Sequence, residues 1–233
     1  MLRILTFLCA ALASLLLSTA ARAQFSYGPR LGATLTTLSS RPERYPSRYS
    51  PLAGAQVGLA GQWQWGAVRL QTAMLYTQKG ARQRTQYALP SPTGELLYDY
   101  RIRTRFGYLE VPLHLAVAPV WARYLQVFAG PYLAMGVGGQ FEQEYQPTGG
   151  QNQPVREARP LEYTAFMKSY ADAQRYDTGI SAGLGYQTGP VLLQAQYSWA
   201  WQNNRPAWYS GPGTARYHRT AALALTYLLP RGT

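Results

Sequence analysis

The chain has almost no cysteine, few acidic residues and no long apolar stretch after its first segment. The single cysteine, Cys9, lies near the N-terminus. Residues 24–233 therefore offer no disulfide, no thiolate nucleophile and no cysteine metal site. That region also lacks the roughly 18 continuous apolar residues that a transmembrane helix needs. This lack excludes a helical membrane protein but not a membrane barrel, whose strands are apolar on one face only.

Residues 1–23 have the pattern of a secretory signal peptide. Arg3 supplies the positive start, residues 5–17 the apolar core, and Ala21-Arg22-Ala23 the small-x-small cleavage site. We expect cleavage after Ala23 and export. Residues 24–233 are then expected to form one domain.

Positive charge far exceeds negative charge in this exported part. Two of the 22 Lys and Arg residues and none of the 10 Asp and Glu residues lie in 1–23, which leaves residues 24–233 with a net charge of +10. Such a charge is typical of proteins that bind nucleic acid, an acidic membrane surface or an acidic partner. Export argues against nucleic acid. The 19 tyrosines and six tryptophans are suited to the aromatic girdles at the two membrane interfaces.

The clearest alternation lies in residues 52–76. Apolar residues such as Leu59 and Trp63 take odd positions before Gly66, and those after it, such as Val68, take even positions. A period of two predicts strands. The change of parity across a two-residue Trp-Gly junction predicts a tight hairpin with one continuous apolar face. Each arm has about 11 residues, enough to cross a bilayer at a tilt. The opposite face is Gln, Gly and Ala, as in the interior of a small barrel.

The same alternation recurs along the chain and predicts eight strands. They cover residues 25–37, the two arms of 52–76, 101–117, 121–140, 175–188, 191–202 and 216–229. Three tight turns alternate with four longer loops at 39–51, 79–98, 141–174 and 203–215, with a short helix expected in 161–174. This pattern predicts an all-β, eight-stranded antiparallel up-and-down transmembrane barrel of the bacterial outer membrane, with short periplasmic turns and long outer loops.

Two features bear on this interpretation. A soluble ligand-binding barrel would turn its apolar face inward, but here the polar face lacks Lys and Glu and the apolar face carries repeated Trp. Within 101–117, Arg101 and Arg103 share the parity of the apolar residues that follow. Either these arginines stand above the membrane, or a bulge near Gly107 shifts the register.

Four segments suggest a family. They are Gly32 within RLGATLTTL, LQTAMLYTQKGA at 70–81, YLEVPLHL at 108–115 and FAGPYLAMG at 128–136. In this order they resemble the PorT-like outer-membrane barrel family of Bacteroidota. The resemblance implies an eight-stranded outer-membrane barrel. The founding member is tied to type IX protein secretion, a role that a shared fold alone does not transfer.

Inside the predicted barrel, Glu110 is the one clear acid at an inward position. Arg30 and Arg69 also point inward by parity. A buried acid needs a partner, so we predict a structural polar network of Glu110 with Arg30 or Arg69, in which the Glu110 carboxylate lies within about 6 Å of an Arg or Lys. The alternative is a solvated acid in a wet lumen. Eight strands leave room for side chains and not for an open pore.

The two histidines, His114 and His218, are the candidates for catalysis. His218 and Ser198 both point inward on neighbouring strands, which keeps open a lipid-modifying enzyme built on a Ser-His arrangement. A rim histidine beside a small hydroxyl is the plainer interpretation. Two histidines far apart in sequence do not make a metal site. We therefore expect no metal, no cofactor and no enzymatic activity.

Basic residues concentrate at the long-loop end. Arginine pairs with phosphate through two parallel hydrogen bonds, so we expect these residues to bind lipopolysaccharide phosphates or an anionic envelope or secretion protein. A generally basic, soluble loop surface is the alternative. The candidates are Arg41, Arg44, Arg48, Arg82, Arg84, Arg101 and Arg103. Taken together, the sequence predicts a monomeric binding or structural barrel, with a narrow pore and a lipid-modifying enzyme as alternatives.

Overall fold

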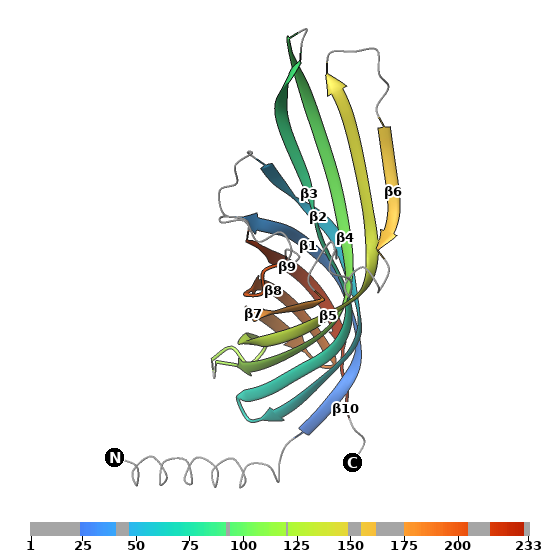
Figure 1. Cartoon of the computed structure of the whole chain (residues 1–233). Helices are drawn as coiled ribbons and strands as arrows, with labels where there is room; N and C mark the ends of the chain where they lie inside the picture. Colours follow the sequence, from blue (N-terminus) through green and yellow to red (C-terminus); the bar gives the residue numbers. More distant parts are fainter. Residues whose placement is uncertain are drawn as a thin grey trace, which may run out of the picture.

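The described strands form one antiparallel sheet of ten. The computed structural model describes residues 24–40, 47–91, 94–119, 121–148, 155–161, 175–204 and 215–230. The strands shown in Figure 1 are β1 Gln24–Ser40, β2 Ser47–Trp65, β3 Val68–Ser91, β4 Gly94–Val117, β5 Leu125–Thr148, β6 Val155–Leu161, β7 Tyr176–Thr188, β8 Val191–Ala200, β9 Arg216–Tyr227 and β10 Leu229–Pro230. None of the described residues forms a helix long and apolar enough to cross a bilayer.

The sheet closes into a barrel. The ring order is β1-β2-β3-β4-β5-β7-β8-β9, and β9 pairs back with β1 from Arg30↔Thr226 to Ser40↔Arg216. Among the described strands, two lie outside the ring: β6 pairs with β5, and β10 follows β9 after Leu228 and pairs with the start of β1. The predicted eight-stranded up-and-down barrel is confirmed.

Side-chain burial follows the predicted parity. On β2, Leu59 is 59% exposed, whereas Gln56 and Gln62 are each 2% exposed. The same contrast holds on β9, where Leu223 is 55% exposed and Ala224 2%. Apolar side chains therefore cover the outside of the ring and polar ones fill its lumen. This is the arrangement of a barrel whose outer face meets lipid.

The two tight hairpin turns use glycine for its conformational freedom. Trp65 pairs with Val68, so the β2–β3 turn is formed by Gly66 and Ala67, one residue later than the predicted Trp-Gly junction. Gly66 has a φ of 59°, and Gly189 in the β7–β8 turn has a φ of 53°. A glycine with positive φ at the first central position is the type II′ arrangement, which matches the twist of the flanking strands.

The predicted loop at 79–98 is wrong, and so is the first part of the one at 141–174. β3 and β4 continue as one paired hairpin to Ser91 and Gly94, and β5 runs on to Thr148 beside β6. Figure 1 shows β3, β4 and β5 rising well beyond the other strands of the ring. Above the membrane both strand faces meet water, so the apolar-polar alternation stops although the strand continues. Similarly, 39–51 is shorter as a loop, because β1 reaches Ser40 and β2 begins at Ser47.

The register question on β4 is settled by its neighbours. The β3–β4 register is the same on both sides of Gly107, so Arg101 and Arg103 keep the outward parity of Leu109. The shift occurs on β5: Gly107 pairs with Gly138 and Tyr108 with Gly136, which leaves Val137 as the extra residue. The arginines therefore stand above the membrane on the outer face. The bulge belongs to the neighbouring strand.

Several predictions fall outside the described residues. They are the signal peptide at 1–23, the helix in 161–174 beyond Leu161, most of the loop at 203–215, and the candidates Arg41 and Arg44.

A charge placed on the outer face near mid-strand should destabilise the barrel in lipid. We expect Leu223→Arg to lower the free energy of unfolding in phospholipid vesicles by about 2–4 kcal/mol, because the guanidinium would lie in hydrocarbon. Urea titrations monitored by tryptophan fluorescence measure this. Val68→Arg is the matched control, since Val68 is also outward but lies beside a turn; we expect a cost of about 0–1 kcal/mol there. Equal costs at the two positions would contradict the assigned lipid face.

Candidate functional site

The half of the lumen nearer the tight turns, here called the lower half, is a network of glutamines around two arginines. Arg30 donates hydrogen bonds across the lumen to the side-chain oxygens of Gln194 and Gln196. Arg69 donates to Gln126 at 3.0 Å, and Gln71 donates to both Gln62 and Gln126, at 2.8 and 3.1 Å. Most of these bonds join strands that are not neighbours in the ring, β1 with β8 and β3 with β5, and Gln194 of β8 donates to Gln71 of β3 at 3.0 Å across the lumen. They hold the lumen closed with long, uncharged acceptors.

The upper half contains a buried ion cluster. Lys79 Nζ lies 2.7 Å from Glu110 Oε2 and 2.8 Å from Asp177 Oδ2, and all three side chains are at most 4% exposed. The same ammonium lies 4.4 Å from the centre of the Tyr132 ring and 5.5 Å from that of Tyr108. One cation is thus shared by two carboxylates and framed by two aromatic faces, which attract it electrostatically.

The ion cluster corrects one sequence-based expectation. Glu110 does pair with a cation in the lumen, but its partner is Lys79 rather than Arg30 or Arg69, whose guanidinium groups bind glutamines. Sequence reasoning missed Lys79 because it was assigned to the loop at 79–98. Had the predicted strand been extended by three residues, from 76 to 79, Lys79 would have shared the inward parity of Thr77.

The histidines do not form the arrangement that the enzyme alternative needs. His218 is 1% exposed, lies against the rings of Phe106 and Tyr108, and has no hydrogen-bond partner on either ring nitrogen among the described residues. Ser198 is 4% exposed and pairs across the strands with Thr220. His114 Nε2 lies 2.6 Å from Ser181 Oγ deep in the lumen. In the described ranges no three His, Cys, Asp or Glu side chains are grouped to hold a metal ion.

Side chains fill the middle of the lumen. Between the lower network and His114 lies a hollow of about 10 Å³, which is hardly enough for one water molecule. Polar side chains therefore occupy this part of the lumen and bond strands of the ring to one another.

The candidate site lies instead on the strands that extend above the membrane. Strand register sets Arg48 opposite Arg84, and Arg84 opposite Arg101; one step nearer the barrel, Arg82 stands opposite Arg103. We call these five residues the arginine face. They line up in two rows, and β5 closes the rows with Glu144 opposite Arg101 and Glu142 opposite Arg103.

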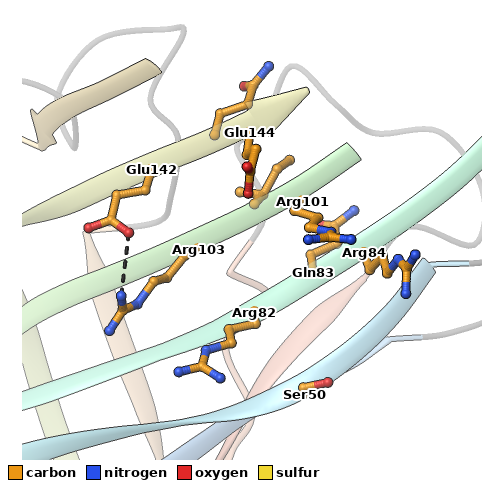
Figure 2. A pocket seen from close by; sticks show the side chains of 10 residues that line it. Ser50, Arg82, Gln83, Arg84, Arg101, Arg103, Glu142 and Glu144 are labelled. Atoms are coloured by element: carbon orange, nitrogen blue, oxygen red, sulfur yellow. Dashed lines mark hydrogen bonds and ion pairs between the residues drawn. The ribbon is translucent and has the colours of Figure 1, made fainter. Parts of the chain in front are cut away.

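The arginine face surrounds a shallow pocket. Its volume is about 610 Å³, and its lining includes Ser50 of β2, four of the five arginines, and Glu142 and Glu144. Figure 2 shows the guanidinium groups spread over β3 and β4, with Ser50 at one side and the glutamates at the other. Side chains opposite one another on paired strands have Cβ atoms about 4.5–5.5 Å apart, so neighbouring guanidinium groups can reach one oxyanion.

Three of these five arginines form ion pairs with acidic side chains. Arg84 binds Asp99 with two bonds, Nε to Oδ1 at 2.9 Å and Nη2 to Oδ2 at 2.7 Å. Arg101 Nη2 lies 3.3 Å from the same Oδ2, and Arg103 Nη1 lies 3.5 Å from Glu142. Hydrogen bonds from Arg84 and the charges of Arg84 and Arg101 hold the pKa of the Asp99 carboxyl below its usual value. Among the described ion pairs none involves Arg82, so the face keeps an excess of positive charge.

The chain matches one protein family over most of its length. The sequence profile described as outer membrane protein beta-barrel domain matches residues 18–204. No curated protein matches the chain.

Several solved outer-membrane proteins are similar in structure. The attachment invasion locus protein Ail of Yersinia pestis has 10% sequence identity and a TM-score of 0.36, with 88% of this chain and 98% of that chain covered. Neisserial surface protein A has 10% identity and a TM-score of 0.40, covering 86% and 96%. OprG from Pseudomonas aeruginosa has 8% identity and a TM-score of 0.31, covering 91% and 96%. At such identities the likeness concerns the fold alone.

Removing the lysine of the ion cluster should be costly. Lys79→Met leaves Glu110 and Asp177 buried without a cation, and we expect the free energy of unfolding in vesicles to fall by about 3–5 kcal/mol. The control variant combines Lys79→Met with Glu110→Gln and Asp177→Asn, which removes every charge at similar shape and should recover most of that loss. If the single and triple variants are equally unstable, the cluster is not held by its charges.

The carboxyl of Asp99 should titrate at unusually low pH. Its pKa is depressed in the folded protein, so the stabilisation by Arg84 is complete above the unfolded value of about 3.9 and is lost as the pH falls through the lower folded pKa. Carbon-13 NMR of the labelled carboxyl measures the midpoint. Arg84→Gln should raise it, whereas Arg103→Gln, which contacts Glu142 instead, should leave it unchanged. If the titration midpoint of Asp99 is the same with and without Arg84→Gln, the assignment is refuted.

Proposed function

The chain belongs to the outer membrane protein beta-barrel domain family, and on that premise we propose that it is a non-enzymatic binding protein whose arginine face holds the phosphate groups of outer-leaflet lipopolysaccharide. The supporting observation is where the arginine face lies. It continues the lipid-facing side of β3 and β4, with unbroken parity, into the region just above the membrane.

The height of the arginine face suits a lipid headgroup. Arg82 lies six residues beyond Tyr76, the last exposed aromatic residue on β3 before the arginines. Six residues span about 20 Å along a strand, or about 14 Å in height at a tilt of about 45°. The polar layer of a leaflet is about 5–7.5 Å thick, so the backbone of Arg82 stands above it, and a long arginine side chain directed towards the membrane can reach it on the side that faces neighbouring lipids.

The chemistry of the arginine face suits phosphate. Arginine presents a planar fork of donors that matches phosphate geometry and is more weakly hydrated than lysine. All five cations of the face are arginines. Asp99 binds Arg84 and lies 3.3 Å from Arg101, and Glu142 lies 3.5 Å from Arg103. An anion of two or more negative charges can compete for these arginines at the Arg82 end.

The alternatives receive less support. A lipid-modifying enzyme needs an accessible Ser-His pair, whereas His218 and Ser198 are both buried and not bonded to each other in the described chain. A narrow pore needs a continuous lumen, whereas the hollow there measures about 10 Å³. Closure of the ring agrees with a monomer. The narrower PorT-like resemblance, the signal peptide and a role in protein secretion stay predictions; a secretion role is tested by protein export in a deletion strain.

Binding should depend on phosphate and on arginine. We expect the protein in neutral detergent to bind lipid A and to bind dephosphorylated lipid A at least tenfold more weakly, a difference of about 1.4 kcal/mol. Replacing Arg82, Arg101 and Arg103 by Gln should remove that difference. Microscale thermophoresis at two salt concentrations measures both effects, because pairing with phosphate weakens as salt rises.

Lysine variants separate phosphate recognition from charge alone. Replacing the same three residues by Lys keeps the net charge but removes the forked donors. An intermediate affinity is expected. Equal affinities for the two lipids, or Gln variants that bind lipid A as well as the parent chain, would refute the proposal.

A further inference from the structure

The three turns at the periplasmic end of the barrel contain a basic residue and no acidic ones. The turns at 66–67, 118–124 and 189–190 contain none of the chain's ten acids, whereas Arg123 lies in one of them and Arg69 enters the lumen just beyond another. A mouth lined by cations, with low-dielectric walls on either side, concentrates anions from the adjoining solution.

A hollow of about 390 Å³ opens at this end, between the β2–β3 turn and the β4–β5 turn. Its lining is Gln64, Gly66, Ala67, Arg69, Ala118 and Arg123. It is far larger than the hollow of about 10 Å³ higher in the lumen. Two arginines, one amide side chain and no carboxylate line it, so its polar groups are almost entirely donors.

Arg69 is the residue whose environment favours a bound ligand. Arg69 is only 6% exposed. Its Nη1 donates a hydrogen bond to Gln126 Oε1 at 3.0 Å, and its Nη2 donates to the backbone carbonyl of Arg123 at 3.5 Å. Its Nε is buried and has no hydrogen-bond partner among the described residues. No carboxylate in the described chain forms an ion pair with it. A buried guanidinium with an unused donor and no counter-charge is costly unless an anion completes it.

The geometry points to a binding site for a small soluble oxyanion, a phosphate or a carboxylate, held between Arg69 and Arg123 at the periplasmic mouth. Membrane lipid cannot supply the ligand, because Arg69 points into the lumen and not towards the outer face. The site is separate from the arginine face, which lies at the opposite end of the barrel. It therefore stands or falls independently of the proposed lipopolysaccharide binding.

Nitrogen-15 NMR of arginine Nε–Hε groups tests this site in the full mature chain in neutral detergent. Titration with inorganic phosphate, and separately with acetate, should shift the Arg69 Nε–Hε signal in a saturable way, while chloride at equal ionic strength should not. The stronger of the two responses identifies phosphate or carboxylate as the preferred group. A signal that moves equally with all three salts would show only general screening, and would overturn the proposal.

Variants assign the response to the site. Arg123→Gln removes an exposed side chain and should fold normally; we expect it to weaken phosphate or acetate binding about tenfold, as for loss of a hydrogen bond to a charged group. Arg219→Gln, on β9 opposite Thr37 and outside the arginine face, is the matched control and should bind like the parent. Unchanged affinity in Arg123→Gln would overturn the proposal.

Discussion

The pairing of β1 with β9 is the constraint on which the rest of the structure depends. Lipid offers no hydrogen-bonding groups, so a sheet that crosses it must satisfy every backbone N–H and C=O within itself, and closing the ring removes the exposed edges. The pairs from Arg30↔Thr226 to Ser40↔Arg216 achieve this. Once the ring is closed, alternate side chains have only two environments, the lipid outside and a narrow lumen inside. The parity of each strand then decides where every residue lies.

The narrow lumen explains why its polar residues are so closely bonded. Eight strands leave an interior just wide enough to be filled by side chains, and water is largely excluded there. Long residues such as Arg30 and Gln71 therefore reach across to partners on other strands, and Lys79 serves two acids at once. Such a cluster is not a strong source of stability by itself, because desolvation offsets most of the attraction. It does make each member dependent on the others.

How much the sequence could predict depended on where each strand lies relative to the membrane. Where one face meets lipid, as at Leu59 and Leu223, the alternation of apolar and polar residues predicted the strands, the ring and the lumen side correctly. Above the membrane both faces are polar, so the continuation of β3 and β4 was taken for a loop although the period of two persists in Arg82 and Arg84. The same error hid Lys79 and gave Glu110 the wrong partner. The pairing of Arg84 with Asp99 depends on strand register, which the sequence does not show until the hairpin is known to continue.

The central claim is that odd residues of β2 between 55 and 61 face lipid while even ones face a closed lumen. Because Cys9 is the chain's single cysteine, single cysteines can be placed at successive positions there in a protein made of residues 24–233, spin-labelled and examined in phospholipid vesicles. Electron paramagnetic resonance then measures how strongly lipid-dissolved oxygen relaxes each label. The account predicts strong relaxation at 57 and 59 and weak relaxation at 56 and 60. The opposite parity, or equal relaxation at all four positions, would contradict it.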